Sequence, residues 1–90
     1  MPSRTVKVGS SIGLHARPAT LVAHAVAESG VPVTLETSAG NPVDGGSALL
    51  IMTLGASFGD DVTVTSDDES VLERIADMVE QDLDASKGDA

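Results

Sequence analysis

The chain has 90 residues, a formal net charge of −9 and a hydrophobic content of 41%. This length allows one small domain, residues 1–90, whose core must come from Val, Leu, Ile and Ala because Phe58 is the only aromatic residue. The absence of cysteine excludes disulfides and thiolate chemistry, and the acidic charge argues against nucleic acid as a partner. No apolar run reaches the ~18–20 residues of a membrane span, so we expect no membrane insertion and a cytoplasmic location.

A strand and a long helix open the predicted order. Residues 5–8 alternate polar and apolar side chains, which predicts a strand with Val6 and Val8 on one face. Residues 16–28 repeat apolar side chains at helical spacing, and the predicted buried stripe is Ala19, Val22, Ala23 and Val26. Gly30 then ends this helix in a left-handed conformation.

Two short strands and a short helix follow. Alternation over residues 31–36 predicts a second strand, and Pro32 restricts its beginning to an edge or an end. Residues 42–44 can form a short third strand. Ser47 is placed to cap a helix over residues 48–54, which Gly55 ends.

A last strand and a last helix complete the chain. Residues 61–65 alternate cleanly and predict a fourth strand. The last helix is predicted to open with a capping box at residues 70–73 and to bury Leu72, Ile75, Ala76, Val79 and Leu83. Residues 85–90 are expected to fray.

The order β-α-β-β-α-β-α predicts an α+β fold of the split βαβ kind. In this topology the fourth strand inserts between the first and the second. The sequence therefore predicts a four-stranded antiparallel sheet with three helices on one face.

Residues 13–20, GLHARPAT, combine an imidazole, a guanidinium and a proline at the start of the long helix. Pro18 is tolerated only in the first turn, so His15 stands where the cap is expected. The N–H groups of Ala16 and Arg17, with the helix dipole, would stabilise an anion, and a neutral imidazole keeps a nucleophilic lone pair. Arg17 can place its planar fork of donors on phosphate oxygens. These residues predict a phosphoryl site, and the plainer alternative is an exposed cap histidine beside a surface arginine.

Residues 13–19 closely resemble the signature of the histidine-containing phosphocarrier (HPr) family of the bacterial phosphoenolpyruvate:sugar phosphotransferase system. Residues 47–55, the length and the order of elements are also similar to that family, so the resemblance covers nearly the whole chain. It implies an open-faced β-sandwich whose His15 accepts a phosphoryl group on Nδ1 from phosphorylated enzyme I and passes it to a histidine of a sugar-permease IIA domain. The resemblance also implies that Arg17 neutralises the negative charge of this phosphoryl group. The resemblance implies a monomeric carrier in sugar uptake, not an enzyme, with no cofactor or metal.

Ser47 falls where some members of the family carry a serine that a dedicated kinase phosphorylates. Gly45 and Gly46 precede it where the family often has a basic residue, and Ala48 replaces a larger apolar residue. Ser47 is therefore either a candidate site of regulatory phosphorylation or simply a helix cap. The alternative function is a regulatory binding module of the same fold controlled through Ser47, although family members of that kind lack the histidine.

Partner proteins are expected to dock on an apolar patch beside the histidine. Thr20, Leu21 and His24 are expected to lie with Arg17 on the helix face turned away from the core. The resemblance implies that Leu49 and Met52 of the short helix lie beside them, so that the docking patch consists of Thr20, Leu21, Leu49 and Met52. The alternative is that Leu49 and Met52 pack inward. His24 lies about half a revolution round the helix from His15, so the two cannot share a metal and His24 is predicted to be a surface residue.

Residues 44–49, DGGSAL, faintly resemble the phosphopantetheine attachment site of an acyl carrier. That protein requires an all-helical bundle. The alternating strands predicted here contradict it.

Overall fold

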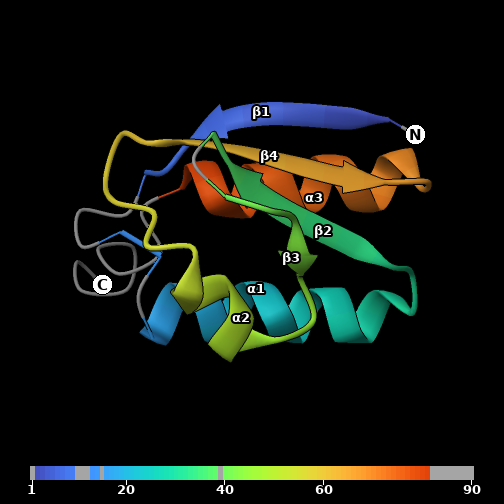
Figure 1. Cartoon of the computed structure of the whole chain (residues 1–90). Helices are drawn as coiled ribbons and strands as arrows, with labels where there is room; N and C mark the ends of the chain where they lie inside the picture. The colour runs from blue at the N-terminus through green and yellow to red at the C-terminus, as the bar shows by residue number, and fades with distance from the viewer. Residues whose placement is uncertain (1, 10–12, 15, 39, 82–90) are drawn as a thin grey trace, which may run out of the picture.

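The computed structural model describes residues 2–9, 13, 14, 16–38 and 40–81. Seven elements follow one another along this part of the chain (Figure 1): β1 (Ser3–Lys7), α1 (Ala16–Ser29), β2 (Val33–Thr37), β3 (Val43–Asp44), α2 (Ala48–Thr53), β4 (Asp61–Ser66) and α3 (Glu69–Glu80). The predicted order of strands and helices is confirmed.

The four strands form one sheet in the order β1-β4-β2-β3, and every neighbouring pair is antiparallel. β4 therefore lies between β1 and β2, as the split βαβ topology requires. The register pairs Val6 with Val62 and Leu35 with Val64, which places their side chains on one face. This sheet excludes the all-helical bundle of an acyl carrier.

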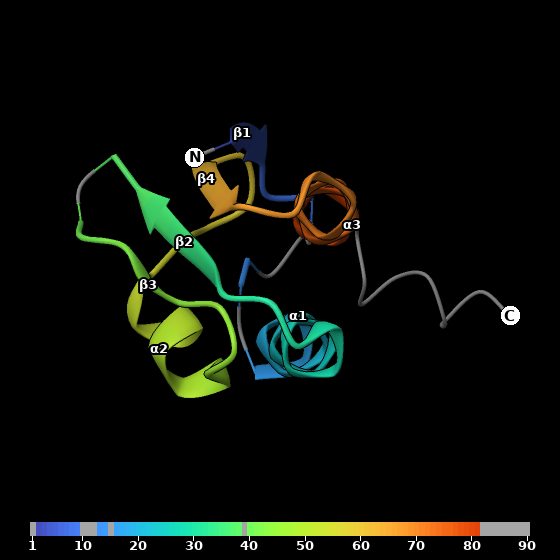
Figure 2. The same ribbon diagram turned by 90° about the vertical axis from the view of Figure 1, so that its right-hand side faces the viewer.

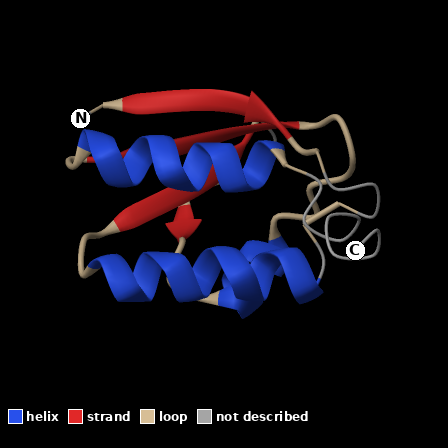
Figure 3. Ribbon diagram, turned by 180° about the vertical axis from the view of Figure 1, so that it is seen from behind, coloured by secondary structure: helices blue, strands red, loops and turns tan. Residues whose placement is uncertain are grey.

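The helices cover one face of the sheet and leave the other open. Figure 2 looks along α1 and α3 and shows them side by side against the sheet, with α2 beside α1 and β3. Seen from behind, the helices lie in front of the strands (Figure 3). The fold is the predicted α+β open-faced sandwich.

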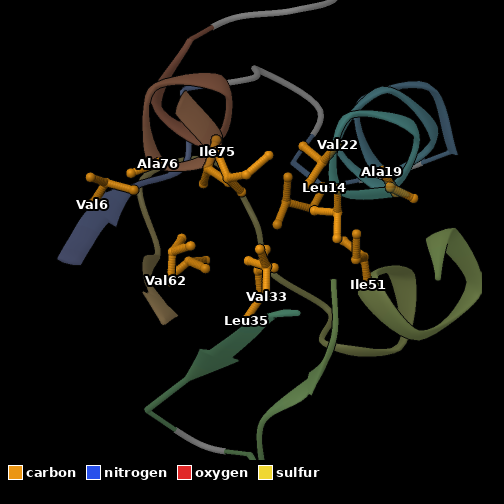
Figure 4. Packing of buried hydrophobic residues seen from close by; sticks show 14 of the residues in the cluster. Val6, Leu14, Ala19, Val22, Val33, Leu35, Ile51, Val62, Ile75 and Ala76 are labelled. Carbon is orange, nitrogen blue, oxygen red and sulfur yellow. The ribbon is translucent and has the colours of Figure 1, made fainter. Parts of the chain in front are cut away.

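Between the helices and the sheet lies a core made of small aliphatic side chains (Figure 4). The predicted stripe of α1 is buried, and Val6 and Val8 of the first strand point inward with it. Core residues with no more than 2% exposure come from every layer: Val8, Ala19, Val22, Val33, Leu35, Ile51, Val62, Val64, Leu72, Ile75, Ala76 and Val79. Such small side chains allow close packing of helix on sheet.

Three local signals act as the sequence predicts. Gly30 has φ 71° just after α1, and Gly55 has φ 64° after α2, so both adopt the left-handed conformation that ends a helix. Ser47 is the N-cap of α2, and its Oγ accepts a hydrogen bond of 3.2 Å from the N–H of Leu50.

The predicted start of the last helix is wrong. The helix begins at Glu69, and its N-cap is Asp68, whose carboxylate accepts hydrogen bonds from the N–H groups of Ser70 and Val71. A carboxylate three residues before the apolar run reaches the first-turn N–H groups, so Ser70 lies inside the helix rather than at its cap. The predicted burial of Leu83 falls outside the described residues.

The strand bounds also differ from the prediction: β1 and β2 differ at both ends, β3 begins one residue later and β4 ends one residue later. β1 runs from Ser3 to Lys7, because pairing with β4 continues to Thr65 beyond the alternating segment. β2 begins at Val33, since Pro32 has no N–H for the ladder.

Candidate functional site

The candidate site is centred on the first turn of α1, which begins at Ala16, directly after residue 15. His15 itself lies outside the described residues. Ala16 and Arg17 are exposed, whereas Pro18 is fully buried and anchors the turn on the core. The Thr20 hydroxyl donates a hydrogen bond of 2.7 Å to the carbonyl of Ala16. The buried Pro18 therefore fixes the turn on the core, and the side of the turn that carries Ala16 and Arg17 is open to solvent.

Gly13 and Leu14, which precede residue 15, are buried and held in place by the rest of the protein. Leu14 is only 4% exposed, and its N–H donates a hydrogen bond of 3.0 Å to the carbonyl of Ala56. Gly13 before it is buried and has φ 80°, a left-handed conformation suited to glycine. In Figure 1 the segment that follows α2 lies at the same end of the molecule as the start of α1.

The outer face of α1 carries the side chains predicted for it. Arg17, Thr20, Leu21 and His24 are all exposed. His24 extends into solvent, and its Nε2 lies 3.2 Å from Oε2 of Glu28. The prediction that His24 is a surface residue is confirmed.

The neighbouring α2 exposes more apolar surface than the sequence interpretation assigned to it. Leu49 is 68% exposed and Leu50 40%, whereas Met52 is half-buried against the core. Leu49 thus faces outward, and Met52 does so only in part. Leu50 was missed. The sequence does contain a signal for the exposure of Leu50. Five of the six residues of α2 are apolar, and a short helix can bury only one of its sides, here the side of Ile51.

Phe58 is an exposed apolar residue that lies outside the candidate site. It is 64% exposed on a turn over residues 56–60. This turn contacts Leu14 through Ala56. Only the tertiary contact reveals that Phe58 lies near the chain that precedes residue 15.

Within the described ranges, no group of three or more histidine, cysteine, aspartate or glutamate side chains could hold a metal ion. In the same part of the chain, no helix combines the length and the apolar character needed to cross a bilayer. The candidate site therefore consists of a helix start, an arginine and two exposed apolar helix faces.

Comparison with known proteins places this geometry in a family. A family model described as "PTS HPr component phosphorylation site" matches residues 2–81. The phosphocarrier protein HPr of Streptomyces coelicolor is 41% identical over 87 residues, which span 93% of this chain and 94% of that protein.

Solved structures agree with this match. The crystal structure of an HPr from Bacillus anthracis superposes with a TM-score of 0.80 at 30% identity, over 87% of this chain and 95% of the other. The crystal structure of HPr-C-His from Thermoanaerobacter tengcongensis gives a TM-score of 0.79 at 29% identity, over 89% and 92%.

The open-faced sandwich and the exposed helix start are those of a class of small phosphocarrier proteins. The chain belongs to the HPr family of the phosphotransferase system. Membership implies protein partners within that system and a role in sugar transport.

Proposed function

We propose that His15 is the phosphoacceptor, which receives a phosphoryl group on Nδ1 from phosphorylated enzyme I and passes it to a histidine of a sugar-permease IIA domain. The observation that supports this best is the position of α1, which begins at the residue after His15 with Ala16 and Arg17 exposed. In each transfer a P–N bond forms on the receiving imidazole as the P–N bond of the donor breaks, so the carrier needs no metal or cofactor of its own.

The start of α1 supplies the electrostatic part of the transfer. N–H groups in the first turn of a helix and the positive end of the helix dipole stabilise the oxygens of a phosphoryl group. Pro18 has no N–H, so in the first turn these donors come from Ala16 and Arg17. The same positive potential disfavours a cationic imidazole, which leaves the lone pair that attacks phosphorus.

Arg17 would neutralise the negative charge of the phosphoryl group. Its side chain belongs to the exposed face of α1. A planar guanidinium can donate two parallel hydrogen bonds to the oxygens of one phosphoryl group. Onward transfer requires that Arg17 and the helix start stabilise the phosphoryl group less in the phosphorylated carrier than in the transition state. A flexible, exposed arginine satisfies this better than a buried one.

We propose that partner proteins dock on the apolar faces of α1 and α2. The predicted patch consists of Thr20, Leu21, Leu49 and Met52, and the exposure of Leu50 enlarges it. α1 and α2 pack against each other, so their exposed faces are neighbours. A few such side chains suffice for a small transient interface, and an acidic carrier favours partners with basic rims. The exchange would take place in the cytoplasm, with the carrier as a monomer.

The test of the phosphoacceptor is incubation with enzyme I and phosphoenolpyruvate, followed by mass spectrometry and phosphorus NMR. We expect one phosphoryl group that is labile in acid and stable in base. His15→Ala should abolish it, whereas His24→Ala, which removes the other histidine of the sequence, should leave it unchanged. Labelling that survives in His15→Ala would overturn the proposal. Retained function in that variant would favour the alternative, a binding module controlled through Ser47.

The docking patch is tested by steady-state kinetics of phosphoryl transfer from enzyme I, with the concentration of the carrier varied. Leu49→Ser should raise KM about tenfold with kcat retained, because the side chain contributes to association and not to the reacting atoms. Phe58→Ser removes an equally exposed apolar side chain outside α1 and α2. Equal effects of the two substitutions would contradict a patch confined to these helices.

A further inference from the structure

Gly13 lies against the peptide backbone of a distant segment. A Cβ added to it would come within 2.5 Å of the carbonyl oxygen of Ala56 and 3.1 Å of the Cα of Ser57. Backbone atoms cannot yield as the end of a flexible side chain can. The close approach leaves no room for a side chain at position 13. It also allows the N–H of Leu14 to donate a hydrogen bond of 3.0 Å to the carbonyl of Ala56. We call these contacts of Gly13 and Leu14 with Ala56 and Ser57 the loop clamp.

The far side of the loop clamp is itself rigid. Asp60 closes a turn by donating its N–H to the carbonyl of Ser57 at 2.9 Å, and its carboxylate accepts from the N–H of Ser57 at 2.9 Å. Two further bonds of 2.9 Å tie this turn to Val8, one from the N–H of Gly59 and one to the carbonyl of Asp60. The carbonyl of Ala56 is therefore attached to a turn that is fixed to the end of β1.

The near side of the loop clamp is anchored in the core. Leu14 is buried and points into the hydrophobic cluster with Val22 and Ile51 (Figure 4). Only two residues separate Gly13 from Ala16, where α1 begins, and one of them, Leu14, is fixed by the core and by its hydrogen bond to Ala56. A displacement at Gly13 must pass to the first turn of α1.

We propose that Gly13 is a positioning residue for phosphoryl transfer, because the missing side chain lets the loop clamp hold the chain that precedes residue 15 against Ala56. The inference rests on the proposed function of His15. Gly13 does not touch the reacting atoms. It sets the position of the start of α1 relative to the proposed phosphoacceptor, His15. A misplacement of the stabilising groups by about 1 Å can lower the rate of transfer by as much as about 100-fold.

Two properties of Gly13 must be separated by experiment, namely its positive φ and its contact with Ala56. Gly30 provides the matched control at the other end of α1, since its φ is 71° and an added Cβ would meet nothing within 4 Å. Asparagine tolerates positive φ better than alanine, but its Cβ occupies the same place. The set is therefore Gly13→Ala, Gly13→Asn, Gly30→Ala and Gly30→Asn in the full chain.

The kinetic measurement is phosphoryl transfer from enzyme I, with thermal unfolding recorded in parallel. Both alanine variants should unfold at lower temperature because of φ strain. Only the two Gly13 variants should lose kcat, by about tenfold or more, with KM for enzyme I retained. Equal kcat in Gly13→Asn and Gly30→Asn would overturn the role of the contact and leave only backbone strain.

A second measurement needs no phosphoryl donor, so it separates this inference from the proposed function. The NMR signals of the residue 15 imidazole should change position in Gly13→Asn, whereas those of His24 should keep their positions and serve as the internal reference. Hydrogen exchange of the Leu14 amide should be slow in the wild-type chain and fast in Gly13→Asn. Rapid exchange of this amide in the wild type would overturn the loop clamp even if every Gly13 variant failed to fold.

Discussion

At the scale of single residues, Arg17 and Ser47 show how position decides what a side chain can do. Arg17 is exposed in the first turn of a long helix, where an anion is also stabilised by N–H groups and the dipole. Ser47 stands at the start of a short helix, where its hydroxyl already accepts the N–H of Leu50. Arg17 is therefore our proposed partner of the transferred group, whereas Ser47 has a structural task.

Arg17→Glu should slow phosphoryl transfer by about 10²–10³-fold, because a carboxylate beside the phosphoryl group repels the charge that the guanidinium would stabilise. The measurement is kcat/KM with enzyme I as donor. Arg74→Glu, an equal change of charge at an exposed position on α3, is the control and should retain the rate. Similar losses in both variants would show a general effect of net charge instead.

Ser47→Ala should lower the free energy of unfolding by about 1 kcal/mol, the usual contribution of an N-cap side chain. Ser47→Asp should retain most of the stability, since its carboxylate can accept the same N–H and favours a helix N-terminus. Urea denaturation followed by circular dichroism measures both. An alanine variant as stable as the wild type would show that α2 is held by packing alone.

At the scale of elements, each helix depends on a different device at its start. α2 begins at a serine cap, α3 at an aspartate cap and α1 at a turn anchored by the buried Pro18. Ion pairs further join β1 to α3. Arg4 of β1 contacts Glu73 and lies 3.8 Å from Asp77 of α3, and these exposed pairs contribute little individually.

Asp68 makes the stability of α3 dependent on pH. The hydroxyl of Ser70 and the N–H of Val71 donate to its carboxylate and hold its pKa below the ordinary value. A carboxyl whose pKa is lower in the folded state stabilises the fold above its unfolded pKa of about 3.9, and this contribution is lost as pH falls through the folded pKa.

Asp68→Asn keeps a cap oxygen but removes the ionisation, so the wild type should exceed it in stability at pH 7 and lose that advantage at about pH 2–3. Urea midpoints at both pH values provide the measurement. Asp67→Asn removes a neighbouring charge that does not cap the helix, and its difference from wild type should stay smaller. A constant gap between wild type and Asp68→Asn across this range would refute the linkage.

At the scale of the whole molecule, the sheet is covered on one face only and the surface is strongly acidic. Pairs such as Lys7 with Asp61, at 2.8 Å, join strands and raise the pKa of the lysine, but only five basic residues face fourteen acidic ones. Repulsion among these charges opposes the compact state.

Added salt should therefore raise the melting temperature. Raising NaCl from about 0.01 M to about 0.5 M shortens the Debye length several-fold and screens repulsion at long range. Thermal unfolding followed by circular dichroism at neutral pH tests this. A melting temperature that falls with salt would mean that the ion pairs outweigh the repulsion.

The sequence by itself determined the order of elements, the antiparallel sheet and the buried stripes, because periodicity and glycine stops are local properties of the chain. Val6, Val22 and Ile75 were all recognisable as core positions in this way. The motif at residues 13–20 likewise carried the candidate chemistry without any tertiary contact.

Only the tertiary structure decided where separate segments meet. Asp68 replaced Ser70 as the cap because the end of β4 sets the point at which the chain turns into α3. Leu50 remained exposed because α2 has room to bury one side only. The contact of Gly13 with Ala56 joins residues 43 positions apart, and no local pattern encodes it, because it arises from the packing of two loops at one end of the sheet.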